Sequence, residues 1–470
     1  MIFTSFTFVV FFIILILFLV ASKNNTYRLY ILLIFSYLFY GRWNVYYLAL
    51  IFIVSFSGWL FGYLIYNEPR KKLKKLYLAI NLFISLGLLA YFKYTNFFIS
   101  SISTLLEQPP VVLDILLPVG ISFFTFQTLS YTMDIYRGKV PLCRSLLKFS
   151  LFVAFFPQLV AGPIVRASEF LPQLNKSIKL KSENWLIGSQ IFLGGALQKV
   201  LIADNLSQFV DVIYQQPQIY SAITLWIAVF AYAIQIFCDF SGYSLMAIGL
   251  SRILGFQLPK NFNMPYNAKS ITEFWHRWHM SLSLWLRDYL YISMGGNRKG
   301  VIRTQLNMFM TMLLGGLWHG ASWNFIIWGA LHGIALGLNR FWVLFLSKRM
   351  QVIVGVKFYN VCAWLITILF VSLLWIPFRS PDIQTSYHII MRLFLATDGI
   401  DWLHTQTLII LSVVLIWHSL HSLRYKLLFD FPMEAAQLNT YQAIFMIMSA
   451  LYLLVLFFPS NASPFIYFQF

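Results

Sequence analysis

The residues best suited to chemistry gather in one stretch of the chain, from Asn263 to Gly333. Four of the eight histidines lie there, at positions 276, 279, 319 and 332, together with six of the 15 tryptophans. Elsewhere the chain is mostly apolar, since 59% of all residues are hydrophobic and only 11% are charged. Polar and ionisable groups are costly inside a membrane, so a chain that concentrates them in one place is expected to do its work there.

His319 ends an apolar run within this stretch. No side chain from Thr304 onward carries a charge until His319, which follows the pair Gly315-Gly316. A lone histidine in apolar sequence is more often a hydrogen-bonded packing residue than a catalyst, but its cost within a membrane favours a functional role. Burial also disfavours the imidazolium ion, so a neutral imidazole could serve as a base. The two glycines permit close approach of a backbone or a ligand.

The segment from Ser270 to Tyr291 is predicted to be a helix that carries many polar side chains. Ser270 and Thr272 are both possible N-caps, and Glu273 stands three residues after Ser270, which is the spacing of a capping box. Glu273 and Arg277 are spaced to pair on one helix face. Such a helix cannot simply face lipid. It is either an amphipathic helix at the membrane surface or a segment enclosed in the protein, and both interpretations stay open.

Other kinds of chemistry have weaker support. His276 and His279 could share a metal ion, but no third ligand is evident nearby, so no metal site is predicted. The three cysteines are scattered and odd in number, which indicates neither a disulfide framework nor a metal cluster. Asp239, inside an apolar run, is either a buried structural acceptor or a group that lines a pathway, and the structural interpretation is favoured. The absence of a Walker motif disfavours a nucleotide-driven pump.

Apolar helices must position these groups. Runs of roughly 20 apolar residues, long enough to cross a bilayer, recur along the whole chain. No hydrophilic block is long enough to fold alone. The sequence therefore predicts an all-α, polytopic integral membrane protein with roughly 11–12 transmembrane helices, plus re-entrant or interfacial helices. We expect one integral domain over residues 1–470, with its catalytic core at about 263–333.

Particular segments carry their own predictions. Lys93 is expected to separate two apolar runs, and Leu146 to Val160, which is short and runs into two prolines, is expected to be re-entrant. The other predicted apolar runs are Ile2 to Val20, Tyr27 to Tyr40, Val45 to Tyr66, Leu76 to Phe92, Tyr94 to Leu106, Asp114 to Tyr136, Trp185 to Ile202, Ile219 to Leu254, Phe325 to Phe345, Val361 to Phe378, Leu408 to Leu420 and Tyr441 to Phe458.

The net charge of +18 comes from 34 basic and 16 acidic residues. In a soluble protein this excess would suggest nucleic-acid binding. Here the basic residues stand in short segments between apolar runs, which is typical of cytoplasmic loops, so no nucleic-acid partner is expected. Some of them could contact anionic lipid or an anionic cofactor. The alternation of runs and basic segments predicts an N-terminus outside and Arg70 to Lys75 in the cytoplasm.

Four blocks of the sequence resemble the membrane-bound O-acyltransferases, in particular the bacterial branch that resembles alginate O-acetyltransferases and includes peptidoglycan O-acetyltransferases. Length and hydropathy fit along nearly the whole chain. The blocks are Phe156-Pro-Gln-Leu-Val-Ala-Gly-Pro-Ile164, Cys238-Asp-Phe-Ser-Gly-Tyr243, Phe274-Trp-His-Arg-Trp-His-Met-Ser-Leu-Ser283 with Arg287-Asp-Tyr-Leu-Tyr291 and Gly295-Gly-Asn-Arg298, and Gly315-Gly-Leu-Trp-His-Gly-Ala-Ser-Trp323.

The resemblance implies an enzyme in which His319 is the catalytic histidine and His279 a second functional histidine. It also implies helices around a central tunnel, acetyl-CoA as a cytoplasmic donor substrate with no bound cofactor, and an envelope polysaccharide as the final acceptor. In this branch a separate exported acetyltransferase commonly completes the transfer, and the protein lies in the bacterial inner membrane. Further candidates for the substrate path are Asp239, Asn263, Trp275, Trp278, Trp318 and Trp323, and the candidates for donor binding are Arg298 and Lys299.

Two other function classes compete with acyl transfer. A transporter, for example one that exports a glycan precursor, would show repeats with broken helices in matching positions and charged residues spread along a path. The sequence shows one focal cluster instead. A structural scaffold would use the same cluster as a docking face. Only an acyltransferase would move a labelled acyl group from a thioester.

The predicted topology can be tested at Lys72. In a variant whose three native cysteines are replaced by serine, Lys72→Cys should be protected from a membrane-impermeant thiol reagent in intact cells, because the basic segment is predicted to face the cytoplasm. Permeabilised cells provide the positive control. Labelling of intact cells would reject this orientation.

Overall fold

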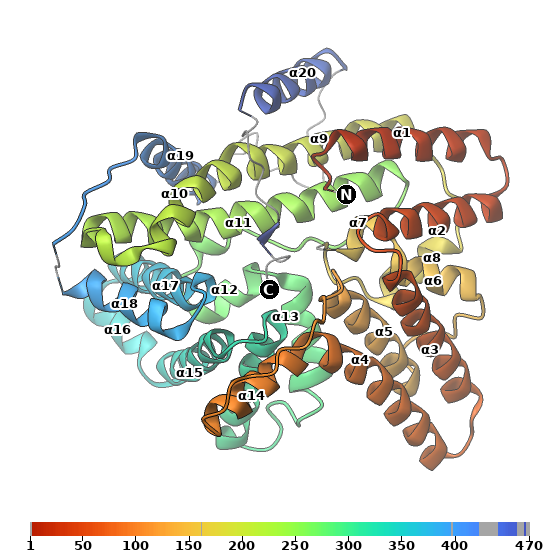
Figure 1. Ribbon diagram of the computed structural model, residues 1–470, viewed down its shortest axis with the longest axis horizontal. Coiled ribbons are helices and arrows are strands. Elements are labelled where there is room, and N and C mark those ends of the chain that lie inside the picture. Colours follow the sequence, from red (N-terminus) through yellow and green to blue (C-terminus); the bar gives the residue numbers. More distant parts are fainter. Residues whose placement is uncertain (1, 161, 396–397, 423–439, 458–464, 467–470) are drawn as a thin grey trace. The chain divides into compact units, whose positions relative to one another are not determined.

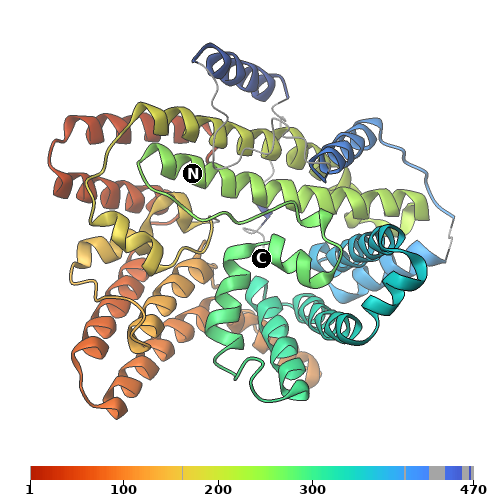
Figure 2. The same cartoon turned by 180° about the vertical axis from the view of Figure 1, so that it is seen from behind.

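The computed structural model describes residues 2–160, 162–395, 398–422, 440–457 and 465–466. These residues form helices joined by loops (Figure 1; from behind in Figure 2). They contain no strand, only an isolated bridge between Tyr220 and Ile400. The helices group into two compact units, of which one comprises Met1–Phe192 with Ser244–Pro259 and the other Leu193–Tyr243 with Lys260–Phe470.

The first unit holds the N-terminal helices. Here α3 packs against α4, α5 and α6, and α2 packs against α1 and α6. A pair of glycines four residues apart, Gly58 and Gly62, lets α3 approach α5 closely: a Cβ at Gly58 would lie 2.2 Å from Thr128 Cγ2. The helices are α1 (Phe6–Ala21), α2 (Asn25–Gly41), α3 (Tyr47–Asn67), α4 (Lys71–Leu105), α5 (Ile121–Tyr136), α6 (Leu146–Ala154), α7 (Phe156–Leu159) and α8 (Ala167–Leu174).

Two longer helices contribute residues to both units, and the remaining helices belong to the second. The two are α9 (Ser182–Leu197) and α11 (Ala222–Ile253). The others are α10 (Asp204–Gln215), α12 (Ile271–Arg277), α13 (Met280–Trp285), α14 (Val301–His319), α15 (Trp323–Phe345), α16 (Ser347–Val354), α17 (Val356–Arg379), α18 (Ile383–Phe394), α19 (Thr405–Ser422) and α20 (Thr440–Leu456). Two π-helical turns, η1 (Gln198–Ala203) and η4 (Leu286–Tyr291), continue α9 and α13.

Several helices have the length and apolar character needed to cross a bilayer. Five helical segments in the described ranges qualify, and a sixth does if α15 and α16, bent by 65°, form one broken span. The prediction of an all-α polytopic membrane protein is confirmed, whereas the count of 11–12 spans and the central tunnel remain predictions. The five segments are Tyr47–Asn67, Lys71–Leu105, Ser182–Gln215, Ala222–Ile253 and Val356–Arg379.

Three boundaries predicted from the sequence are wrong. Lys93 does not separate two helices, because it lies inside α4, a single helix of 35 residues whose first turn also contains most of the basic segment predicted to be a loop. The run from Asp114 is helical only from Ile121, since Pro118 and Gly120 precede it and Gly120 has a left-handed φ of 76°. The segment ending at Ile202 continues through η1 into α10. By contrast, the expected interruption of the helix within Leu146 to Val160 is present, at Phe155 between α6 and α7, and its re-entrant course remains a prediction.

Glycines also allow α14 and α15 to pack closely in the second unit. A Cβ at Gly316 would lie 2.2 Å from the carbonyl oxygen of Phe325, and one at Gly329 would lie 2.4 Å from that of Met312. The Gly315-Gly316 pair, expected to admit either a backbone or a ligand, thus admits at Gly316 the backbone of α15. This packing fixes where His319, the last residue of α14, lies relative to α15.

Gly316→Ala should therefore destabilise the protein by about 1–3 kcal/mol, because the added methyl group overlaps a backbone oxygen that cannot move aside alone. The measurement is thermal unfolding of the purified protein in detergent. Gly87→Ala in α4 is the matched control, because no atom lies within 4 Å of the position that a Cβ would take there, and alanine is the better helix former. Equal unfolding temperatures for the two variants would contradict the close-packing argument.

Candidate active site

The segment predicted as one helix from Ser270 to Tyr291 is broken in its middle, at His279. Helix α12 ends at Arg277 and α13 begins at Met280, while His279 itself has a left-handed φ of 41°. Backbone hydrogen bonds to another segment replace those of the helix, since the Met280 N–H donates to Asn261 O (2.8 Å) and the Asn263 N–H to Arg277 O (2.9 Å). A left-handed φ is strained for histidine and persists only where the surroundings hold it, which is typical of functional sites.

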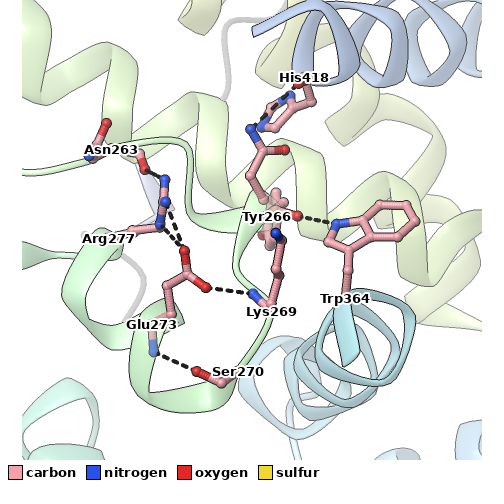
Figure 3. A network of polar contacts seen from close by, with 9 residues as sticks. Asn263, Tyr266, Lys269, Ser270, Glu273, Arg277, Trp364 and His418 are labelled. Carbon is pink, nitrogen blue, oxygen red and sulfur yellow. Dashed lines mark hydrogen bonds and ion pairs between the residues drawn. The ribbon is translucent and has the colours of Figure 1, made fainter. Parts of the chain in front are cut away.

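Polar contacts fix the start of α12 (Figure 3). The Ser270 hydroxyl accepts a hydrogen bond from the Glu273 N–H (3.1 Å), and the Glu273 carboxylate accepts one from the Lys269 N–H (2.8 Å). Arg277 pairs with Glu273 at 2.8 Å and donates to the carbonyl oxygen of Asn263 (3.2 Å). The predicted N-cap and the predicted pair between Glu273 and Arg277 are both confirmed. They anchor the chain immediately before His279.

His279 is fully buried and its proton can be placed from its partners. Its Nδ1 lies 3.1 Å from Asn261 Oδ1, which also accepts hydrogen bonds from the Ser281 hydroxyl (2.9 Å) and the Ser281 N–H (3.3 Å). An amide oxygen has no proton to donate and can only accept a hydrogen bond, so Nδ1 carries the proton. Nε2 is then an acceptor, and it has no hydrogen-bond partner among the described residues.

His319 lies at the C-terminal end of α14 and is 3% exposed. Its ring lies edge-on to three aromatic neighbours, with centroid distances of 5.0 Å to Trp318, 5.1 Å to Trp328 and 5.3 Å to Phe378. Gly320 leaves no room for a side chain, since a Cβ there would lie 2.0 Å from the ring of Phe325. The Trp-His-Gly sequence thus places an imidazole in an apolar, aromatic enclosure.

The structure brings the two predicted histidines to one aromatic cluster. Trp318 contacts both of them, at a centroid distance of 6.1 Å from His279 and 5.0 Å from His319. On the other side of His319, Trp328 contacts a third histidine, His332, at 4.6 Å. Three histidines that lie within 53 positions of one another in the chain therefore contact the rings of Trp318 and Trp328.

His332 was not predicted to take part in the site. It is fully buried, and the Trp275 indole N–H donates to its Nδ1 at 3.3 Å. The acceptor role of Nδ1 places the proton on Nε2, the opposite tautomer from that of His279. Two sequence signals point to this residue: it is one of the four histidines gathered between residues 263 and 333, and it stands one helical turn after Trp328.

Asp239 occupies a separate charged cluster. It is 1% exposed and pairs with Lys199 at 2.5 Å, and Lys199 also pairs with Asp204 at 2.7 Å. The backbone N–H of Ile466 donates to its other oxygen at 2.8 Å. This arrangement matches the favoured structural interpretation. The neighbouring Phe240 packs edge-on against His279 at a ring-centroid distance of 4.6 Å, so the residue after Asp239 contacts the candidate site.

The other predicted residues fall into two groups. Trp275, Trp278 and Trp318 are buried in the cluster. Trp323 is 51% exposed and Asn263 is exposed, so neither lies among the buried rings. Asn261, two residues before Asn263, is the amide that contacts His279, and nothing in the sequence distinguished the two. Arg298 and Lys299 are exposed and follow the turn at Gly295 and Gly296, both of which have positive φ.

A cavity of about 370 Å³ adjoins the two short helices that flank His279. Its lining is mostly apolar and includes Trp275, which contacts His332, and Met280, which follows His279. Arg287 and His276 provide polar groups in its wall. The described residues contain no group of three or more histidine, cysteine or acidic side chains that could hold a metal ion. Neither His279 nor His319 lines this cavity, whose wall suits an apolar or amphipathic ligand.

The sequence is also similar to those of known proteins. The chain is 41% identical over 401 residues to a probable alginate O-acetylase of Pseudomonas aeruginosa, covering 84% of this chain and 75% of the relative. A probable alginate O-acetylase of Pseudomonas putida is 37% identical over the full length of both chains. A peptidoglycan O-acetyltransferase of Helicobacter pylori is 35% identical, covering 82% of this chain and 76% of the relative. Residues 143–376 match the membrane-bound O-acyltransferase family, and the chain belongs to this family of membrane acyltransferases.

Proposed function

We propose that the protein takes an acetyl group from cytoplasmic acetyl-CoA and passes it across the bacterial inner membrane for O-acetylation of an envelope polysaccharide of the alginate or peptidoglycan type. Transfer to the glycan is completed by an exported acetyltransferase partner. The observation that carries the proposal is the convergence of His279 and His319 on Trp318 in a chain about 40% identical to alginate O-acetylases. The N-terminus faces outside in this proposal.

The bilayer is a barrier to the acetyl donor, and this explains why such a protein is needed. Acetyl-CoA is large and highly charged and cannot cross a hydrocarbon layer unaided. A protein that holds the thioester on one side and an alcohol on the other needs to move only the acetyl group. The cavity beside Trp275 and Met280, with Arg287 in its wall, is a suitable place for the acetyl end of the donor.

In the proposed reaction the acceptor hydroxyl oxygen attacks the thioester carbonyl carbon. A C–O bond forms, the C–S bond breaks, and the hydroxyl proton passes to His319 and then to the departing thiolate. General base catalysis of this kind contributes about 10²–10⁴-fold. Alignment of the two substrates in a closed site supplies much of the remaining acceleration.

His279 has a different role from that of His319, and its tautomer limits which hydrogen bonds it can form with a substrate. An imidazole whose Nδ1–H is bound to Asn261 presents only a lone pair at Nε2. It therefore cannot polarise the donor carbonyl by donating a hydrogen bond from Nε2. It can orient a substrate by accepting a hydrogen bond from its hydroxyl or amide group.

Transfer of labelled acetyl from acetyl-CoA by the purified protein tests the function directly. In proteoliposomes with donor on one face, an acyltransferase releases free CoA in proportion to the acetyl groups that reach an alcohol acceptor on the other face. An exporter of glycan precursors would leave the thioester intact. No transfer under conditions in which the protein is folded would reject the proposal.

His319→Ala should lower acetyl transfer by at least about 10²-fold while the protein stays folded, because the general base is lost. His319→Gln separates base catalysis from packing, since glutamine forms hydrogen bonds but takes up no proton near neutral pH. A catalytic role predicts that both variants fail, whereas a packing role predicts that glutamine restores activity. Initial rates and unfolding temperatures of both variants decide between these outcomes, and near-normal turnover of a folded His319→Ala protein would contradict the assignment.

Replacing Arg298 and Lys299 together by alanine should raise KM for acetyl-CoA with little change in kcat, because the two exposed cations would contact the donor phosphates rather than the reacting atoms. The double variant Lys348→Ala/Arg349→Ala makes the same change in charge at another exposed pair. An unchanged KM in the first variant, or an equal rise in both, would show that the two residues are not a donor site.

A further inference from the structure

A second cavity, of about 540 Å³, lies within the first unit and differs in character from the apolar cavity near His279. It is bounded by α8, the segment 175–181, the start of α9 and the end of α11. Both α9 and α11 are parts of helices apolar enough to span a bilayer. A cavity where two such helices end lies at the level of the lipid headgroups.

The charges around this cavity favour an anion. Four cationic side chains line it against two carboxylates, so its wall carries a net charge of +2. The Nε of Arg252 is buried and has no hydrogen-bond partner among the described residues, which leaves a donor for an incoming acceptor. The charged lining residues are Lys176, Lys179, Lys181, Arg252, Glu169 and Glu183.

The walls of the cavity are held in place by hydrogen bonds. The Gln173 side-chain amide accepts from the Gln257 N–H (2.8 Å) and donates to the Gln257 carbonyl (3.0 Å). Between Lys176 and Lys179, the Ile178 backbone is bound on both sides, because its N–H donates to Asn25 Oδ1 (2.9 Å) and its carbonyl accepts from Arg28 Nη1 (2.6 Å). The cavity is therefore preformed, which lowers the entropic cost of filling it.

We infer that this cavity is a phosphate site that takes the headgroup of an anionic phospholipid. Lysine and arginine near the ends of spanning helices mark the cytoplasmic side of a membrane, and the cytoplasmic leaflet carries the anionic lipids. A phosphodiester matches the excess of positive charge and the unused Arg252 donor. Its glycerol end would meet the apolar side chains of Ile178 and Phe256, which also line the cavity.

Lipid selectivity of the whole protein tests the inference first. Protein purified in a neutral detergent is titrated with fluorescent phosphatidylglycerol and, separately, with fluorescent phosphatidylcholine. We expect about tenfold or more tighter binding of phosphatidylglycerol, because contacts of basic residues with anionic lipid contribute about 1 kcal/mol each. Equal binding of the two lipids would overturn the proposal.

Variants then locate the site. Lys176→Gln/Lys179→Gln/Lys181→Gln should weaken phosphatidylglycerol binding by about tenfold or more. The variant Lys72→Gln/Lys74→Gln/Lys75→Gln makes the same change in net charge at the exposed start of α4, away from the lining residues, and should change it by less than about twofold. An equal loss in both triple variants would show an effect of bulk charge and reject the site.

Arg252→Lys keeps the charge but removes the Nε donor, so it should weaken phosphatidylglycerol binding and leave phosphatidylcholine binding unchanged. This conservative variant decides the matter if the triple variant fails to fold. Free CoA and inorganic phosphate serve as competitors, because a soluble phosphate compound has the same chemistry. Displacement of the lipid by either compound at concentrations below those at which phosphatidylglycerol binds would reject the lipid as the occupant.

Discussion

The candidate active site depends on the side chain and backbone of one amide residue, Asn261. Its Oδ1 accepts three hydrogen bonds, from His279 Nδ1 and from the N–H and hydroxyl of Ser281, and its backbone oxygen accepts a fourth from Met280. Buried donors are expensive to leave unpaired, so these four bonds together stabilise the break between α12 and α13. They also set the tautomer of His279 and leave its Nε2 as the one ring nitrogen able to accept a proton or a hydrogen bond.

Aromatic side chains surround the other predicted histidine, His319. Trp318, Trp328 and Phe378 surround the imidazole edge-on, an arrangement that suits the charge distribution of aromatic faces. The close approach of α14 to α15 at Gly316 brings Trp328 to this position. Hydrogen bonds to Asn261 thus orient His279, and aromatic rings surround His319; in the proposed function the first is the orienting group and the second is the base.

Features that depend only on residues close together in the chain could be predicted from the sequence. The capping of α12 by Ser270 and the pair between Glu273 and Arg277 were predictable, because each depends on helical spacing alone. The break at His279 was not, since its hydrogen bonds go to Asn261 and Asn263, which come from outside the helix. The hydrogen bond of His332 with Trp275 and the ion pair of Lys199 with Asp239 were missed for the same reason, because each joins residues that are distant in the chain. The role of Gly316 could not be predicted either, because it depends on the close approach of α15.

Two groups of charged side chains, one around Lys199 and one around Arg252, differ in how their charges are paired. Lys199 is buried between Asp204 and Asp239, and the backbone N–H of Ile466 supplies a further donor to Asp239. Buried charges that are paired and hydrogen-bonded in this way are costly to disturb but have no capacity left for a ligand. The cavity around Arg252 has the reverse property, because its cations outnumber its carboxylates and a buried donor is unused. The ion pair of Asp239 with Lys199 is compatible with a structural role for Asp239, and the excess of cations in a preformed cavity is what a binding site for an external anion requires.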